Sequence, residues 1–248
     1  ILLRVMAGKD ARQPNGVPFF NIDVPLKNHS LKNKRIISFM GWDLPLEEGV
    51  RDLTEKSLEK FEELGASVEV IDLPMAMEKV WEAWVTLRSW SVANSLAKEF
   101  HDPEKRKLMK KPLIWEIKRG LSLNGDEIVQ ASKTRSDWFK KMASVLGQYD
   151  AAVLPSTQVQ PFNIEKEYPE FISNYPMDTY HRWMQVVVPA SLIGLPAINL
   201  PAGFCKNKLP FGIQLIGKQF SDNNLLSIAK GWHSATNFPE KYPPTFAN

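Results

Sequence analysis

Residues 35–74 read RIISFMGWDLPLEEGVRDLTEKSLEKFEELGASVEVIDLP. The first six, RIISFM at 35–40, form a short apolar run that predicts a strand. Residues 44–66 then carry apolar side chains at helical spacing with charged residues opposite, which predicts an amphipathic helix. SVEVIDLP at 67–74 begins with alternating valines and ends at a proline, which predicts a second strand. A strand, a helix and a strand in this order form a βαβ unit, so part of the sheet is expected to be parallel.

Two details of that unit can be read from single residues. Glu47 and Glu48 favour the amino-terminal turn of the predicted helix, because carboxylates there face the positive end of the helix dipole. Gly65 is placed to end the helix.

Strands and helices continue to alternate along the rest of the chain. The opening ILLRVM predicts the last turns of a helix, and residues 9–34 predict a loop. Further helices are expected at 75–99, around 115–117, and at 126–146, 177–194 and 221–236, the last with Ser221 as N-cap. Further strands are expected at 149–155, 195–204 and 209–217, with a turn at Cys205–Lys208, a basic connector at 101–112 and an extended surface loop at 155–176. The predicted class is α/β, with a mixed β-sheet flanked by helices.

The charge balance excludes several function classes. The 31 basic and 28 acidic residues give a net charge of +3, so the surface is mixed. The basic runs at 27–35 and 102–111 are short and interrupted, which favours solvated faces over a nucleic-acid or membrane patch. The longest apolar run, VVVPASLIGLPAI, falls short of the ~18–20 apolar residues of a membrane span. The one cysteine, Cys205, rules out an intrachain disulfide and suits a reducing compartment, so a cytoplasmic location is expected.

The sequence contains no recognisable catalytic nucleophile. There is no G-x-S-x-G elbow, and no serine directly follows a glycine. The four histidines (His29, His101, His181 and His233) have no metal-ligand spacing and are expected at the surface or at helix edges. Cys205 stands in a predicted turn beside Lys206, which would lower the pKa of its thiol, but no base accompanies it. No phosphate-binding glycine motif is present either. Because both this motif and a metal-ligand spacing are missing, neither a cofactor nor a metal is predicted.

The eight tryptophans offer two interpretations. Trp81, Trp84 and Trp90 have helical spacing, which is typical of core packing. Trp115 and Trp183 stand near predicted helix or loop boundaries, where an indole either fills the core or walls an apolar pocket.

Several segments carry motifs in a consistent order. LPFGIQLIGKQFSDNNLLSIAKGWHSAT at 209–236 resembles the carboxy-terminal pattern of amidase-signature enzymes, a glycine-x-Gln-leucine-x-glycine strand followed by an aspartate and a leucine-rich helix. The matching residues are Leu209, Pro210, Gly212, Gln214, Gly217, Asp222, Leu225 and Leu226. The stretch 186–204 resembles the segment before it, through Pro189, Gly194, Pro196, Pro201, Gly203 and Phe204. Residues 2–14, 47–74 and 149–157 are similar to further segments of the same family.

The resemblance implies a mixed sheet covered by helices and the hydrolysis of a carboxamide. In that family a lysine, a serine in a cis peptide and a nucleophilic serine form the catalytic triad and an acyl-enzyme. All three precede the helix end that LLRVMAG resembles. We therefore expect residues 1–248 to be the carboxy-terminal part of one amidase-signature domain, with no catalytic residue of their own.

The same resemblance implies the substrate-pocket residues. Family members that use glutamine carry an acidic residue five positions before the helix proline, and here that position is Met184, flanked by Trp183. A methionine cannot pair with an ammonium group, so an apolar or aromatic acyl group is predicted rather than glutamine. Thr157 follows the strand that delivers loop residues to the pocket in that family. Trp115 is the fourth predicted substrate-binding residue, from its place near a predicted helix or loop boundary and not from the resemblance.

The expected partners are a small-molecule amide and the amino-terminal half of the enzyme. A homodimer is left open, and neither nucleic acid nor membrane is predicted. Two alternatives remain: a catalytically inactive amidase-like binding or structural module, and the glutamine-hydrolysing subunit of a tRNA-dependent amidotransferase. Met184 argues against the second.

Overall fold

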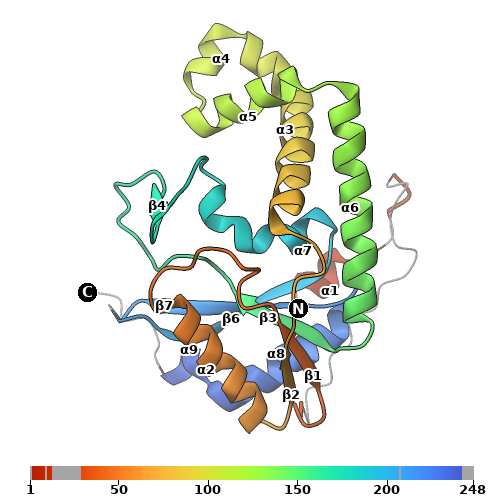
Figure 1. Cartoon of the computed structure of the whole chain (residues 1–248), viewed down its shortest axis with the longest axis vertical. Helices are drawn as coiled ribbons and strands as arrows, with labels where there is room; N and C mark the ends of the chain where they lie inside the picture. The colour runs from red at the N-terminus through yellow and green to blue at the C-terminus, as the bar shows by residue number, and fades with distance from the viewer. Residues whose placement is uncertain (1, 9, 13–28, 207, 242–248) are drawn as a thin grey trace.

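A five-stranded mixed sheet forms the centre of the protein (Figure 1). The computed structural model describes residues 2–8, 10–12, 29–206 and 208–241. The sheet has the order β2-β1-β3-β7-β6. Strand β1 lies parallel to both β2 and β3, whereas β7 is antiparallel to β3 and to β6. The strands are β1 (Arg35–Ser38), β2 (Ser67–Val70), β3 (Ala151–Pro155), β6 (Ala197–Phe204) and β7 (Pro210–Ile216). The parallel pairing predicted from residues 35–74 and the mixed sheet are confirmed.

Helices cover both faces of this sheet (Figure 1). The helices of the described residues are α1 (Leu2–Met6), α2 (Val50–Glu63), α3 (Met77–His101), α4 (Pro103–Lys107), α5 (Lys111–Ser122), α6 (Gly125–Leu146), the 3-10 helix η1 (Arg182–Val187), α7 (Val188–Leu192), α8 (Asp222–Thr236) and α9 (Phe238–Lys241). A two-residue hairpin, β4 (Phe171–Ile172) with β5 (Tyr175–Pro176), lies apart from the sheet. No helix among the described residues is long and apolar enough to cross a membrane.

The two faces of the sheet have separate cores, because successive side chains of a strand point to opposite sides. In β1, Ile36 packs under α2 and α8, whereas Ile37 packs under α3, α6 and η1. On the α2 and α8 face, Phe61 stacks on Trp232 with ring centroids 4.6 Å apart. On the opposite face, Trp138 of α6 is fully buried and donates its indole N–H to the Pro189 carbonyl over 2.9 Å.

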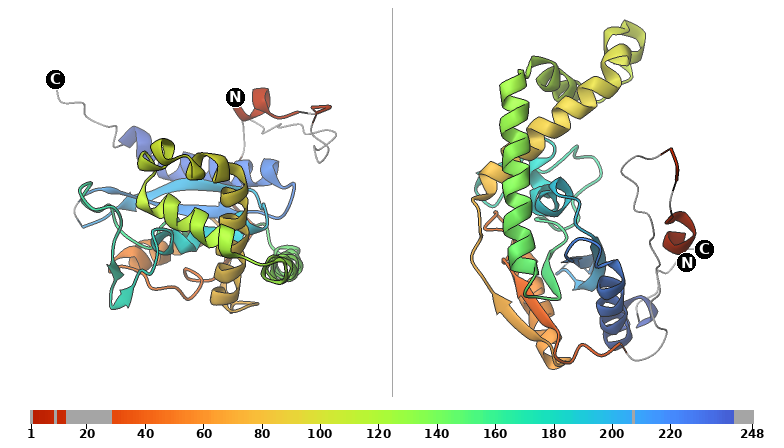
Figure 2. Two further views of the ribbon diagram at one scale, coloured as in Figure 1. Left: turned by 90° about the horizontal axis from the view of Figure 1, so that it is seen from above. Right: turned by 90° about the vertical axis from the view of Figure 1, so that its right-hand side faces the viewer.

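Helices α3, α5 and α6 extend away from the sheet as an arm (Figures 1 and 2). Gly120 of α5 allows α3 and α5 to approach each other closely. A Cβ at Gly120 would lie 2.0 Å from the carbonyl oxygen of Ser89 and 2.5 Å from Cβ of Ala93, both in α3. Only a residue without a side chain fits this crossing.

The structure corrects the predicted start of the helix in the βαβ unit. It begins at Val50 rather than near residue 44, because Gly49 adopts a left-handed φ of 85° before it. Glu47 and Glu48 therefore precede the helix, and Glu48 pairs with Lys206 at 2.5 Å. The first turn contains Asp52 instead.

Other corrections concern connecting segments. The predicted connector 101–112 contains helix α4, whose amino terminus is capped by Asp102. Residues 155–176 are more than a surface loop, since Val159 and Ile172 are buried in a small cluster of their own. The segment 177–194 forms η1 and α7 rather than one continuous helix, with a non-helical residue at Met184.

The predictions for the last long helix and for the opening residues have different outcomes. Ser221 occupies the N-cap of α8, but its hydroxyl donates to the Lys218 carbonyl at 2.7 Å and makes no cap bond. The helix end predicted for the opening residues is present as α1. Within the predicted loop 9–34, residues 9 and 13–28 lie outside the described residues.

Candidate functional site

A hollow of about 570 Å³ opens where β3, β6 and β7 meet η1. Most of its lining is apolar, and the few polar groups come from β6 and from the segment after β3. The lining residues are Ser156, Thr157, Val159, Gln160, Pro161, Phe162, Trp183, Asn199, Pro201, Pro210, Phe211 and Gly212. An apolar hollow with a few polar groups at the ends of strands is typical of small-molecule sites.

The structure brings two of the predicted pocket residues together here. Thr157 and Trp183 both line the hollow. Trp183 is half-buried and packs edge-on against Phe162, with ring centroids 5.4 Å apart and planes at 84°. These two aromatic rings form one continuous apolar wall.

The floor of the hollow is tightly packed around Gly212. The amide and the hydroxyl of Ser156 both donate to the Gly212 carbonyl, at 3.1 and 2.9 Å. A Cβ at Gly212 would lie 2.7 Å from Oδ1 of Asn199 and 3.0 Å from Oγ of Ser156. The Ser156 hydroxyl is therefore engaged in holding the floor.

Three side chains from different parts of the chain anchor Val186, three residues after Trp183. Trp42 donates its indole N–H to the Val186 carbonyl over 2.8 Å, and Gln214 donates to the same carbonyl over 3.1 Å. The Gln158 side-chain oxygen accepts the Val186 amide N–H over 3.1 Å. Gln214 also donates to the last carbonyl of β3 over 3.0 Å. Buried polar groups of this kind fix one arrangement, because any other leaves them unpaired.

The Trp42 side chain is presented by an unusual turn. Met40, Gly41, Trp42 and Asp43 all have positive φ, at 45°, 83°, 62° and 56°. Each non-glycine residue in this region costs of order 1–3 kcal/mol and persists only when its surroundings hold it. Here the fully buried Trp42 ring, stacked on Phe39 at 4.5 Å, supplies that hold.

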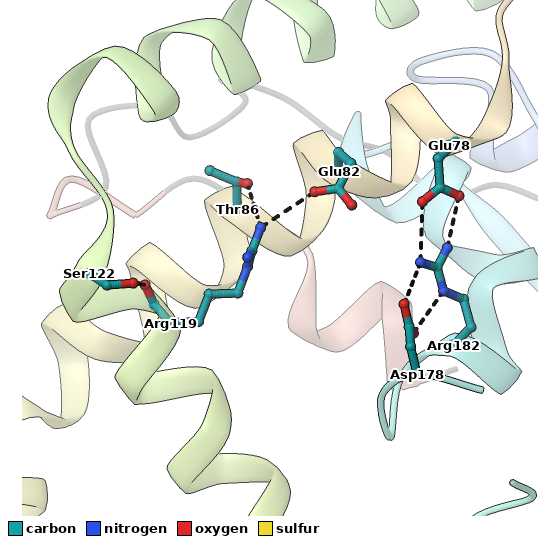
Figure 3. Close-up of polar contacts among 7 residues, drawn as sticks. All are labelled: Glu78, Glu82, Thr86, Arg119, Ser122, Asp178 and Arg182. Atoms are coloured by element: carbon teal, nitrogen blue, oxygen red, sulfur yellow. Dashed lines mark hydrogen bonds and ion pairs between the residues drawn. The ribbon is translucent and has the colours of Figure 1, made fainter. Parts of the chain in front are cut away.

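Arg182 joins the start of η1 to the arm (Figure 3). Its guanidinium donates to both carboxylate oxygens of Glu78 in α3, at 3.0 and 3.2 Å, and to both of Asp178, at 3.0 and 2.8 Å. It also lies 4.3 Å above the Trp81 ring. These hydrogen bonds hold the pKa of Asp178 below its ordinary value. Figure 3 also shows Arg119 of α5 contacting α3, so both ion-pair groups meet on that helix.

The other two predicted pocket residues lie outside this hollow. Met184 is half-buried at the irregular point of η1 and is not among the lining residues. Trp115, 39% exposed on α5, lines a separate hollow of about 210 Å³ with Tyr168 and Tyr180. The roles predicted for both residues in substrate binding stay predictions.

One expectation for titratable residues holds and one is wrong. His181 is the N-cap of η1, a helix edge as expected, and it is buried there. Its pKa falls to about 4, first because burial disfavours the charged form and second because Arg88 is nearby. Burial and the Glu47 carboxylate raise the pKa of the Cys205 thiol instead of lowering it. The neighbouring Lys206 does not lower that pKa, because its ammonium pairs with Glu48.

The part of the chain that the structure describes contains no group of three or more His, Cys, Asp or Glu side chains placed to hold a metal. The sequence reasoning missed Gln158, Gln214 and Trp42 as residues that position the site. Gln214 belonged to a quoted motif, but its partners are far away in the chain.

Comparison with known proteins gives consistent matches. A family model described as Amidase matches residues 1–226. One glutamyl-tRNA(Gln) amidotransferase subunit, from Legionella pneumophila (strain Corby), is 26% identical over 272 residues, covering 96% of this chain and 53% of that protein. The same-named protein of Thermotoga maritima is 30% identical over 206 residues, covering 75% of this chain and 42% of that protein.

Solved structures agree on the fold. A bacterial aryl acylamidase of the amidase signature enzymes matches with a TM-score of 0.83 at 21% identity, over 97% of this chain and 51% of that chain. The glutamyl-tRNA(Gln) amidotransferase subunit from Thermotoga maritima matches with a TM-score of 0.63 at 26% identity, over 97% and 49%. The chain spans about half the length of the curated relatives it matches. By its sequence and its fold, the chain belongs to the amidase-signature family.

Proposed function

We propose that the protein carrying this chain hydrolyses carboxamides to a carboxylate and ammonia or an amine. This chain supplies the scaffold and one wall of the pocket that takes the acyl group. The observation that carries the proposal is the apolar hollow walled by Trp183, Phe162 and Phe211 at the ends of three strands. Family membership supports the amide chemistry.

The proposed reaction passes through a serine acyl-enzyme. A serine oxygen attacks the amide carbon as a base removes its proton, the amine leaves with a proton, and water then hydrolyses the ester. The residues lining the hollow include no lysine or histidine to act as that base. The Ser156 hydroxyl donates to the Gly212 carbonyl. Because the family resemblance implies a triad that precedes the segment LLRVMAG, we propose that it lies outside residues 1–248, in an amino-terminal half that completes the same domain.

An apolar or aromatic acyl group is the proposed preference. Burial of an aromatic group stabilises binding by about 25 cal/mol per Å² of apolar surface removed from water. Trp183 and Phe162 provide the apolar wall against which such a group is buried. Met184 stands where glutamine-using relatives carry an acid, as the family resemblance implies, and adds no charge beside that wall.

Glutamine hydrolysis in a tRNA-dependent amidotransferase is the second candidate. It is favoured by the curated relatives, which are named as subunits of glutamyl-tRNA(Gln) amidotransferase. The two candidates differ in substrate, because the second requires release of ammonia from glutamine. A comparison of glutamine with aryl and alkyl amides separates them.

The test uses the full-length protein that carries this chain. A fluorophosphonate probe reacts with an activated serine, and peptide mapping locates that serine. We expect hydrolysis of apolar amides and a labelled serine outside residues 1–248. A labelled serine within these residues overturns the placement of the triad, and a folded protein that neither reacts with the probe nor cleaves any amide overturns the function.

Met184→Asp tests the specificity argument separately. We expect this variant to shift preference toward amides that carry an amino group, with Met184→Leu as the matched control. An unchanged substrate ranking removes Met184 from the pocket without affecting the proposed chemistry.

The proposed location is the cytoplasm. The argument is the single cysteine, Cys205, which suits a reducing compartment.

A further inference from the structure

A second hollow lies between the first turns of α5 and the loop that precedes η1. Its volume is about 210 Å³, below the ~300–1,000 Å³ of pockets for drug-sized ligands. Trp115 lines it from α5, and Tyr168 and Tyr180 line it from the loop. It shares no lining residue with the Trp183 hollow, so it is a separate site.

The aromatic rings of this hollow stand at steep angles to one another. The rings of Tyr168 and Tyr180 have centroids 5.9 Å apart and planes at 80°. Tyr180 is held from behind by edge contacts with His181 at 5.3 Å and with Trp183 at 6.5 Å. Trp115, Tyr168 and Tyr180 thus bring three aromatic rings to one small hollow, and aromatic rings attract organic ammonium ions over their faces.

The charges of the lining favour a cation. Glu167 and Asp178 both line the hollow, and Lys111 is its one basic residue. Among the described residues Glu167 has no ion-pair partner, and Asp178 shares the single Arg182 guanidinium with Glu78. Lys111 is exposed at the start of α5, so its long stem can carry the ammonium into solvent.

We propose that this hollow binds a small organic ammonium ion, with Trp115, Tyr168 and Tyr180 around the charge and Glu167 beside it. The proposal does not depend on amide hydrolysis, because binding at this site is measured without turnover. Two other occupants are outcomes of the test: a neutral apolar group, and an anion drawn to Lys111.

Choline and its neutral carbon isostere, 3,3-dimethyl-1-butanol, are the probes. Each is titrated into the full-length protein by calorimetry and by ligand NMR at low ionic strength. A cation–π contribution of about 1 kcal/mol corresponds to roughly fivefold in affinity, so choline is expected to bind at least about fivefold more tightly than the alcohol. Trp115→Leu and Glu167→Gln are each expected to weaken choline binding by a similar factor, and Lys111→Gln is expected to strengthen it.

Matched controls isolate the site from general effects of charge and surface. Glu165→Gln and Lys118→Gln make the same charge changes on the same segments outside the lining, and Trp90→Leu removes an exposed indole elsewhere on the arm. All three are expected to leave choline binding unchanged.

Three results overturn the proposal. Equal binding of the alcohol and choline identifies a merely apolar hollow. Binding of acetate that is lost in Lys111→Gln identifies an anion site. No choline binding at millimolar concentration removes the site altogether. Glu167 and Lys111 are exposed, so their variants are expected to fold even if Trp115→Leu does not.

Discussion

Gly120→Ala is the sharpest test of how the arm is built. The added Cβ would lie 2.0 Å from the Ser89 carbonyl oxygen and 2.5 Å from the Ala93 Cβ. Ordinary contacts of this kind are about 3.5–4.0 Å, so α3 and α5 must move apart by more than an ångström. Backbone forms one side of the clash, so a rotamer change cannot relieve it.

The expected magnitude follows from two opposing terms. Overpacking of this kind costs about 1–3 kcal/mol or more, and the better helix propensity of alanine returns up to about 1 kcal/mol. We expect a net destabilisation of about 2 kcal/mol. For 248 residues that corresponds to a fall in Tm of roughly 4–8 °C, and for a longer full-length protein to a smaller fall.

The assay is thermal and urea unfolding of the full-length protein followed by circular dichroism. Gly125→Ala is the matched control, because a Cβ at Gly125 in the first turn of α6 meets nothing within 4 Å. The control is expected to be neutral or slightly stabilising. A Gly120→Ala protein as stable as the control would refute the close crossing of α3 and α5.

Three further predictions concern buried polar groups. Trp42→Phe keeps a ring in the core but deletes the N–H that donates to the Val186 carbonyl. We expect the free energy of unfolding, measured in urea, to fall by about 1 kcal/mol. A variant as stable as the wild type contradicts the proposed anchoring of Val186. His181 has a pKa of about 4 in the folded protein against 6.5 normally, so the unfolded chain binds more protons between these values and stability should fall as pH drops from 6.5 to about 4. That slope should shrink in His181→Gln, and an identical pH profile of Tm would refute the burial. Arg88→Met removes the partner, at 2.6 Å, of the buried Glu116 and should cost about 1–3 kcal/mol, because Arg88 itself is 43% exposed. Adding Glu116→Gln should restore most of that loss, and failure of the rescue argues against an uncompensated buried carboxylate.

Most of the fold was predicted from the local periodicity of apolar residues. The spacing in residues 35–74 predicted the βαβ unit, and the parallel register of β1 with β2 confirms it. The start of α2 was misplaced because the charge pattern continues upstream of Gly49. The helix begins only after Gly49, because the left-handed backbone of that glycine is not helical.

The candidate site was predicted only in part. Thr157 and Trp183 line one hollow and Trp115 lines another, and their roles in substrate binding stay predictions. The residues that position η1 could not be predicted, because Gln158 and Trp42 show no local pattern. Their common partner, Val186, lies 144 residues from Trp42 and 28 residues from Gln158.

The sequence by itself determined the alternation of helices and strands and the family motifs, because each depends on residues within a few positions of one another. Tertiary structure alone decided which groups are buried together. The burial that distant segments impose lowers the pKa of His181 and raises the pKa of the Cys205 thiol. The two hollows are separate for the same reason: packing of the arm, the loop and the sheet places Trp115 and Trp183 on different walls.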